Sequence, residues 1–188
     1  MDNVAGRAAS ATPKLDRWLP DVALRVSHRR ESSASADELW EAARAIRLTD
    51  TALLGRLVRW RIPGLERDLS FDALFRQPPF LVLAEGERSL VSGLVGRIWT
   101  LRRDYPQLES AEEFETWTVG GTARVVLASW AETAPDGRGA LASEARVQAL
   151  GSQGRVGVAA VRPVVRAFQN LVGSEGIGAA VRRAERGR

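Results

Sequence analysis

Residues 21–40 read DVALRVSHRRESSASADELW, and this stretch decides how the chain begins to fold. Over residues 21–32 apolar and polar side chains alternate, which is the period of a strand with one buried face. Ser35-Ala36-Asp37-Glu38 follows and has the pattern of a capping box, in which the serine oxygen accepts from a backbone N–H and the glutamate reaches back. A strand is therefore expected to pass directly into a helix that ends near Thr49.

Three further short helical segments are expected. Asp50 is the predicted N-cap of a second helix, which Ile62-Pro63-Gly64 ends. Ser70 is expected to cap one short turn over 71–75. A second capping box at 110–113 opens a helix that a pair of glycines ends.

Two hairpins supply the remaining strands. The first joins apolar strands at 80–83 and 90–95, and the second joins strands at 123–133 and 140–150 through Pro135-Asp136-Gly137. The strands of the first hairpin are apolar on both faces, so they are expected to be covered on both sides or strongly twisted. Gly93 and Gly96 predict a bulge or bend in that hairpin.

The last segment has the spacing of a long amphipathic helix. Apolar side chains recur at helical intervals from Val161 to Val181, with an interruption at 173–176. Pro163 is expected to start or kink this helix, because proline cannot donate the i→i−4 hydrogen bond. The glycines of the interruption predict that the last turns are loose.

The order of these elements predicts an α+β fold. A curved antiparallel sheet is expected to pack on the long C-terminal helix, with two short helices after the first strand. A single domain is expected over 21–188, behind a flexible N-terminal tail over 1–20. Small side chains at Gly157, Ala159 and Ala160 leave room beneath the helix, so a cavity between sheet and helix is expected.

Several segments resemble the START-like superfamily, the helix-grip proteins that include polyketide-cyclase-type and birch-pollen-allergen-type proteins. The strand over 22–32 followed by SADELW (35–40) resembles their opening. Four segments are similar to an uncharacterised bacterial branch: FLVLAE (80–85), LVSGLVGRIW (90–99), SAEEF (110–114) and SEARV (143–147). The resemblance covers roughly residues 22–186. It implies a helix-grip fold with a hydrophobic cavity; none of these segments is a catalytic motif.

Composition excludes several classes of protein. Of the 188 residues 45% are hydrophobic and 27% charged, which suits one globular domain. Without cysteine the chain has no disulfide, thiolate metal site or cysteine nucleophile. No run of about 18 apolar residues occurs, and residues 1–13 lack the apolar core of a secretory signal. A cytoplasmic protein without a membrane span is expected.

The net charge of +4 is concentrated near the C-terminus. Every basic residue except Lys14 is an arginine. Residues 153–188 hold seven arginines against two glutamates, a net +5, whereas residues 1–152 are nearly neutral. An electrostatic partner is therefore expected only at the terminal helix.

Five residues are predicted to contact a ligand: His28, Trp99, Ser129, Ser143 and Phe168. The histidine and both serines share a strand face with apolar residues, where polar atoms need partners that a cavity could supply as water or ligand. The alternatives are a solvated or hydrogen-bonded histidine at a strand end and hydroxyls satisfied by nearby backbone. The alternative for the two aromatic side chains is the core, where aromatic residues on strands and helices usually lie.

Glu144 and Arg146 share the other face of the strand that carries Ser143. They predict a surface ion pair or, if that face is covered, a buried carboxylate suited to acid–base chemistry. Because His28 is the single histidine, a metal site with two histidines is excluded. No catalytic residue, metal or cofactor is predicted.

Three functions remain open at this point. The first is noncatalytic binding of a small hydrophobic molecule, lipid- or polyketide-like, between sheet and helix. The second is a cyclase- or aromatase-type enzyme that uses the same cavity. The third is macromolecular binding through the arginines of the terminal helix, although the chain lacks the interleaved aromatic and basic residues of RNA-binding modules, so nucleic acid is not favoured. The oligomeric state is not predicted.

Overall fold

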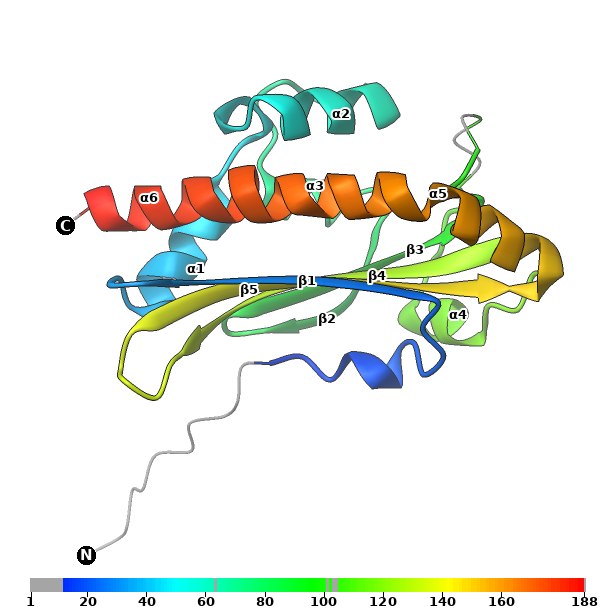
Figure 1. Cartoon of the computed structure of the whole chain (residues 1–188), viewed down its shortest axis with the longest axis horizontal. Helices are drawn as coiled ribbons and strands as arrows, with labels where there is room; N and C mark the ends of the chain where they lie inside the picture. Colours follow the sequence, from blue (N-terminus) through cyan, green and yellow to red (C-terminus); the bar gives the residue numbers. More distant parts are fainter. Residues whose placement is uncertain (1–11, 63, 101, 103–104, 188) are drawn as a thin grey trace, which may run out of the picture.

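The computed structural model describes residues 12–62, 64–100, 102 and 105–187. Its centre is an antiparallel sheet of five strands in the order β1-β5-β4-β3-β2 (Figure 1). The strands are β1 (Leu24–Ser32), β2 (Leu81–Gly86), β3 (Ser89–Gly96), β4 (Thr122–Thr133) and β5 (Gly139–Leu150). The predicted α+β fold is confirmed, because a long C-terminal helix crosses one face of this sheet.

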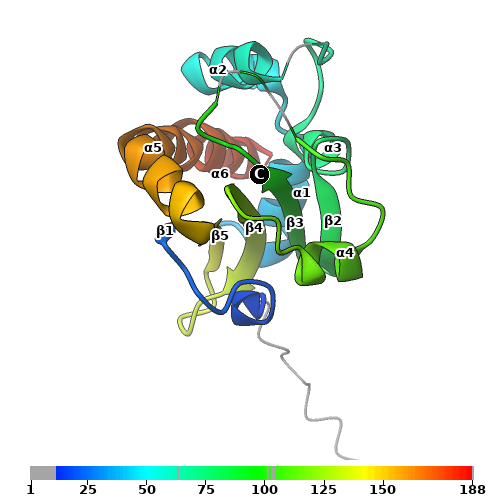
Figure 2. The same cartoon turned by 90° about the vertical axis from the view of Figure 1, so that its right-hand side faces the viewer.

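The helices divide unequally between the two faces of the sheet (Figure 2). One face is covered by α1 (Ala36–Ala45), α3 (Phe71–Leu74), α5 (Gly151–Leu171) and α6 (Gly178–Arg186), with α2 (Leu53–Arg61) packed on α5, and the other face is covered by α4 (Ala111–Thr116). We call the first the helix face, which on β4 carries Val125, Leu127 and Ser129. We call the second the opposite face, which on β4 carries Val126, Ala128 and Trp130.

Both faces of the β2–β3 hairpin are covered, as its apolar sequence predicts. Leu90 packs on the helix face, whereas Val91 and Val95 pack on the opposite face. The register shift lies in β2, between Val82 and Ala84, so of the predicted bulge or bend at the glycines of β3, the bulge is not at these glycines.

Gly93 has a different role from the predicted bulge. A Cβ atom there would lie 2.7 Å from Leu83 Cδ1 and 2.8 Å from Phe114 Cε2. Glycine therefore lets α4 lie close to the opposite face. Gly96 ends β3 with a φ of 140°, which favours glycine.

The start of α2 also differs from the prediction. Asp50 ends a 3-10 turn, η2 (Leu48–Asp50), and its carboxylate accepts from the backbone N–H before that turn at 2.9 Å. The cap of α2 comes from Glu175 of the C-terminal helix, whose Oε2 accepts from the first two N–H groups of α2, both at 3.0 Å. Asp50 is thus not the N-cap of this helix. Pro63, expected to end it, lies outside the described residues.

The C-terminal helix begins earlier than predicted, and its last turns are packed against the rest of the protein. It starts at Gly151, continues through the exposed Pro163 into a π-helix, η3 (Val172–Ile177), and then into α6. The expectation of loose last turns is wrong, because Ala180 and Val181 of α6 are buried against α1. Small side chains let the two helices lie close together. No helix in the described part of the chain is long and apolar enough to cross a membrane.

The end of the expected tail packs on the opposite face. Leu15, Trp18 and Leu19 are buried, and the ring of Trp18 meets Phe114 edge-on with centroids 6.4 Å apart. Their spacing of three and one is that of an apolar stripe on a helical turn, a signal present in the sequence. Residues 1–11 of the expected tail lie outside the described residues.

Candidate functional site

Three of the predicted site residues form one row across the helix face. His28 of β1 is paired in register with Ser143 of β5, and Ser143 is paired with Ser129 of β4. Residues directly opposite one another in antiparallel strands have neighbouring side chains on the same face. The fold therefore brings together a histidine and two serines, which we call the polar row.

Two atoms of the polar row are buried without a hydrogen-bond partner among the described residues. They are Nε2 of His28 and Oγ of Ser143. A buried polar atom without a partner costs about 1–3 kcal/mol, and most such atoms in native proteins are satisfied. Each of these two atoms can therefore form a hydrogen bond with a bound molecule, either as donor or as acceptor.

The C-terminal helix lies directly over the polar row. A Cβ atom at Gly173 in η3 would be 2.6 Å from Cγ and Nδ1 of His28, so glycine permits this approach. Gln169, one helical turn earlier, is also buried at 4% exposure. Single π-helical turns within α-helices occur frequently at functional sites, and this one coincides with the polar row.

The helix does not seal the middle of the helix face. Leu127 and Ser129, near the middle of the long central strand β4, are only half-buried, although Val125 and Ala131 on either side are buried. His28 is likewise half-buried on β1. The helix face is thus partly exposed at the polar row, while Val125 and Ala131 on either side are buried.

Trp99 and Phe168 lie away from the polar row. A Cβ atom at Gly157 would be 2.3 Å from ring atoms of Trp99, which places this ring under the first turns of α5. Gly157 precedes Gly173 by roughly 24 Å of helix at the standard rise. Phe168 packs in a hydrophobic cluster with Leu54 and Val58 of α2. The structure therefore brings together three of the five predicted residues and separates these two from them.

Ser92 is a further polar residue on the helix face that the sequence analysis did not single out. It is 1% exposed, and its Oγ donates to the carbonyl oxygen of Phe75 at 2.8 Å. Ser92 alternates with Leu90 and Leu94 on one strand face, and this pattern is visible in the sequence. This hydroxyl is satisfied, in contrast to that of Ser143.

Removing the unpaired hydroxyl of Ser143 is expected to stabilise the ligand-free protein. Ser143→Ala should raise the free energy of unfolding by about 1 kcal/mol, because Oγ loses its hydration without gaining a hydrogen bond. Ser92→Ala is the matched control and should lower it by about 1–3 kcal/mol, since a buried carbonyl loses its donor. Urea denaturation measures both. Equal losses of stability in the two variants would contradict the assignment of Ser143 Oγ as unpaired.

Glu144 and Arg146 lie on the opposite face, buried beneath the N-terminal segment. Glu144 accepts hydrogen bonds from Arg146 and, at 2.8 Å, from Arg25, and Arg146 also binds Asp16. Burial lowers the pKa of Arg146, but the hydrogen bonds to Glu144 and Asp16 outweigh it, so the pKa lies above its ordinary value. The pair is therefore buried rather than exposed, and it links the N-terminal segment to the sheet on the side away from the polar row.

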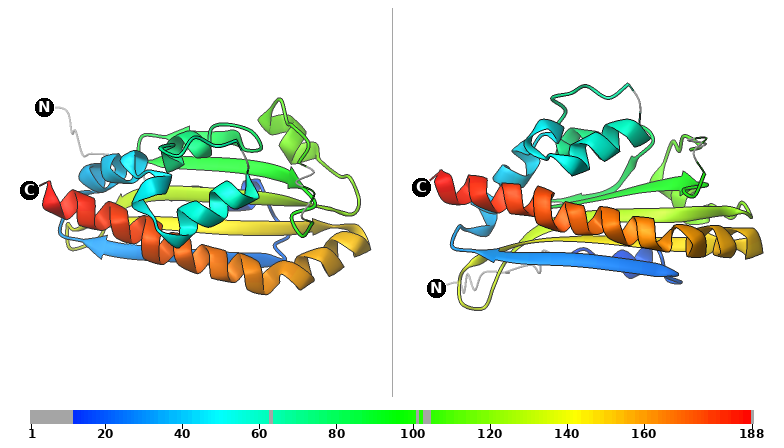
Figure 3. Two further views of the ribbon diagram at one scale, coloured as in Figure 1. Left: turned by 90° about the horizontal axis from the view of Figure 1, so that it is seen from above. Right: turned by 45° about the horizontal axis from the view of Figure 1, so that its top comes forward.

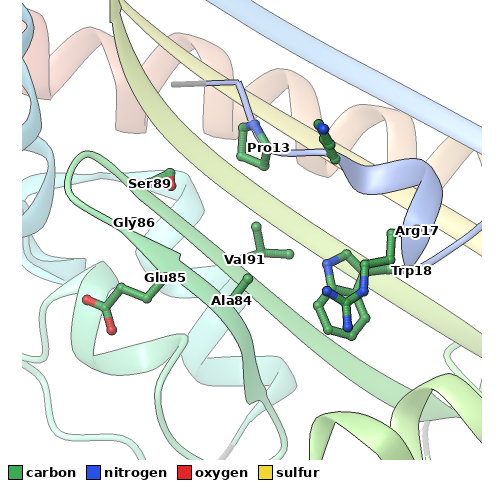
Figure 4. Close-up of a pocket in the computed structure, with 9 residues that line it drawn as sticks. Pro13, Arg17, Trp18, Ala84, Glu85, Gly86, Ser89 and Val91 are labelled. Carbon is green, nitrogen blue, oxygen red and sulfur yellow. The ribbon is translucent and has the colours of Figure 1, made fainter. Parts of the chain in front are cut away.

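A separate hollow lies between the N-terminal segment and the β2–β3 hairpin (Figure 4). Its volume is about 240 Å³, with Trp18 and Val91 in its apolar part and Lys14, Arg17 and Glu85 among its lining residues. None of the five predicted site residues lies there. Assigning residues 12–20 to a tail is the reason why the sequence analysis missed it.

Comparisons with known proteins add two distant structural similarities. No family model matches the chain, and no curated protein matches it. A hypothetical protein from Helicobacter pylori is 10% identical, with 97% of this chain and 99% of that chain covered and a TM-score of 0.41. The Zhui aromatase/cyclase from Streptomyces sp. R1128 is 21% identical, with 85% and 94% covered and a TM-score of 0.36. Both TM-scores are below 0.5, and neither similarity extends to an activity of this chain.

Proposed function

We propose that this chain binds a small, largely apolar molecule between the helix face and the C-terminal helix, through at least one hydrogen bond to the polar row. The observation that carries this proposal is the pair of buried, unpartnered atoms, Nε2 of His28 and Oγ of Ser143, on paired residues of neighbouring strands. A ligand with one hydroxyl or carbonyl oxygen can satisfy both. Its apolar part would lie against the half-buried Leu127 and Val26.

The chemistry of the ligand follows from the surroundings of the polar row. Most of its strand neighbours on the helix face are apolar, namely Val26, Leu127, Ala131, Leu141 and Ala145, and Arg30 of β1 is the charged one. No carboxylate pairs with His28 in the described part of the chain, and Arg30, the charged neighbour, is exposed. A neutral or weakly polar molecule, such as a lipid or a polyketide-like ring system, fits these surroundings best.

Binding without catalysis is the simpler function for this arrangement. A catalytic histidine is normally held by a second group that orients it and sets its tautomer. Among the described residues no hydrogen bond from another side chain orients the ring of His28. Membership of the START-like superfamily belongs to the same proposal, and the order of strands and helices supports it.

The single histidine makes the proposal directly testable. Protein labelled with ¹⁵N is titrated with a panel of fatty acids and aromatic polyketides, and the imidazole resonances of His28 are followed by NMR while thermal shift measures stabilisation. A true ligand should move these resonances and raise the melting temperature. Ser143→Ala should weaken binding about 5- to 30-fold, the loss expected for one buried hydrogen bond.

The control variant is Ser27→Ala, on the exposed opposite side of β1. It should bind the ligand as the wild type does. A ligand that binds equally well to Ser143→Ala and leaves the imidazole resonances unchanged would overturn the proposal. Turnover of the bound molecule by the wild type, lost in His28→Phe, would replace binding by cyclase- or aromatase-type catalysis.

A further inference from the structure

The arginines of this protein fall into two groups. Nine arginines of the described residues form ion pairs, for example Arg29 with Glu132 at 2.8 Å and Arg76 with Glu85 at 2.6 Å. The arginines of α2 and α5 form none: within the described residues, no carboxylate lies within 4.0 Å of Arg56, Arg59, Arg61, Arg155, Arg162 or Arg166. Neither helix contains an acidic residue.

The exposed hydrophobic side chains lie on the same two helices. Of the large hydrophobic residues that are exposed in the described part of the chain, Leu53 (47%) and Trp60 (59%) lie on α2, and Val156 (72%) and Val164 (67%) lie on α5. The remaining one is Val119. Exposed apolar side chains gathered in this way mark interaction surfaces more often than scattered ones do.

Helix geometry arranges these residues in strips along α5. Gly157, Val158 and Gln169 face the protein, and the exposed residues occupy the other side. At 100° per residue, the exposed side divides into an arginine strip and an apolar strip next to it. The arginine strip is Arg155, Arg162 and Arg166, and the apolar strip is Val156, Ala160, Pro163, Val164 and Ala167.

Helix α2 extends the same surface. It packs against α5 through Val58 and Phe168, and the view from above shows α2 and the C-terminal helix side by side, turned to the viewer (Figure 3). Leu53, Arg56 and Trp60, spaced by three and four residues, form its exposed stripe. The acidic Glu175 beside it accepts hydrogen bonds from the N-terminus of α2. We call the exposed residues of α2 and α5 the α2–α5 surface.

We propose that the α2–α5 surface binds the surface of a bilayer that contains anionic phospholipids. The arginines would lie at the phosphate level and the valines, Leu53 and Trp60 at the boundary of the acyl chains, which is how amphipathic helices bind membrane interfaces. The apolar strip favours a bilayer over a nucleic acid, because the phosphate backbone of a nucleic acid offers valine no apolar partner. It also favours a bilayer over a second copy of this chain, since two copies of a surface whose charged side chains are all arginines would repel each other. This inference stands without the proposed ligand.

Vesicle co-sedimentation tests the inference. Wild-type protein should bind phosphatidylcholine vesicles that contain about one third phosphatidylglycerol, bind pure phosphatidylcholine much more weakly, and dissociate as NaCl rises from about 0.1 M to about 0.5 M. The triple variant Arg155→Gln, Arg162→Gln, Arg166→Gln should weaken binding to anionic vesicles roughly 100-fold, at about fivefold per arginine. The double variant Val156→Ser, Val164→Ser should weaken it about tenfold, because the apolar contact is lost.

Two matched controls separate this surface from net charge and general hydrophobicity. The triple variant Arg17→Gln, Arg29→Gln, Arg138→Gln removes the same charge from ion-paired arginines away from the α2–α5 surface, and Val119→Ser removes an exposed valine outside that surface. Both should keep binding within about threefold of wild type.

Three outcomes would overturn the inference. The first is equal loss of vesicle binding in the charge-matched control. The second is binding to a DNA duplex or single-stranded RNA but not to anionic vesicles. The third is a dimer in analytical ultracentrifugation that the double valine variant abolishes, which would assign the surface to a second copy. Thermal unfolding of every variant confirms that these exposed substitutions leave the fold intact.

Discussion

Phe114→Ala is expected to lower the free energy of unfolding by about 3–5 kcal/mol, the range for deleting a fully buried aromatic side chain. Phe114 is 0% exposed on the opposite face. Its ring meets Trp18 edge-on and lies under the guanidinium of Arg124, whose carbon is 5.7 Å from the ring centroid. The ring occupies the space that the missing Cβ of Gly93 leaves open, so its removal leaves a cavity.

The loss of stability in Phe114→Ala should exceed the loss from the apolar contacts alone. Arg124 is buried, and its Nη1 donates to the carbonyl oxygens of Phe114 and Glu115 at the end of α4. Burial lowers the pKa of Arg124, and the charge of Glu115 opposes this only in part. If α4 shifts after the substitution, a buried cation loses hydrogen bonds, which adds to the cost.

Guanidinium denaturation followed by tryptophan fluorescence measures this effect, since Trp18 reports on the same cluster. Val119→Ala, at a half-exposed position just after α4, should change the free energy of unfolding by no more than about 0.5 kcal/mol. A loss below about 1 kcal/mol for Phe114→Ala would show that α4 and the N-terminal segment contribute little to the fold.

Gly55→Ala is expected to lower the free energy of unfolding by about 3 kcal/mol, although alanine is the better helix former. In an unpacked helix the same change would stabilise by about 0.5–1 kcal/mol. At this position a Cβ atom would lie 2.0 Å from the carbonyl oxygen of Leu48 and 2.9 Å from its carbon. These are backbone atoms of η2, so either η2 or α2 must move.

Gly176→Ala is the matched control within the C-terminal helix. Its Cβ would lie 3.6 Å from Cδ2 of Leu54, an ordinary van der Waals contact, so its effect should be within about 0.5 kcal/mol. Thermal and urea unfolding of the two variants gives the difference. A gain in stability for both would contradict the close packing of α2 on η2. The arrangement in which Glu175 caps α2 beside η2 would then need another explanation.

Much of the polar row could be predicted from local pattern. The two-residue alternation along each strand predicts that Ser129 shares a face with apolar residues of its strand. The same alternation predicts this for Ser143 in the next strand. Their pairing also had a local signal, because each lies seven residues from Asp136 at the centre of the connecting turn. His28 has no such signal, since β1 and β5 are joined by more than 100 residues of intervening chain.

The errors share one physical cause. Asp50 has the local pattern of an N-cap, but the carboxylate of Glu175 takes that position on α2 from the far end of the chain. Gly93 has the local pattern of a bulge, but its role is to admit Phe114 from another element. Local propensities are small compared with the packing of distant segments, so the tertiary contact prevails where the two compete.

By itself, the sequence determined the helices, the strands, the turn at 135–137 and the side chains that share each strand face, because these follow from backbone periodicity over a few residues. Only the tertiary structure decided which sheet face the C-terminal helix covers, and hence that Nε2 of His28 and Oγ of Ser143 are buried while Glu144 and Arg146 lie beneath the N-terminal segment. It also packed α2 against α5, about 100 residues later in the chain. Burial and charge proximity depend on distances in space, and separation along the chain does not set those distances.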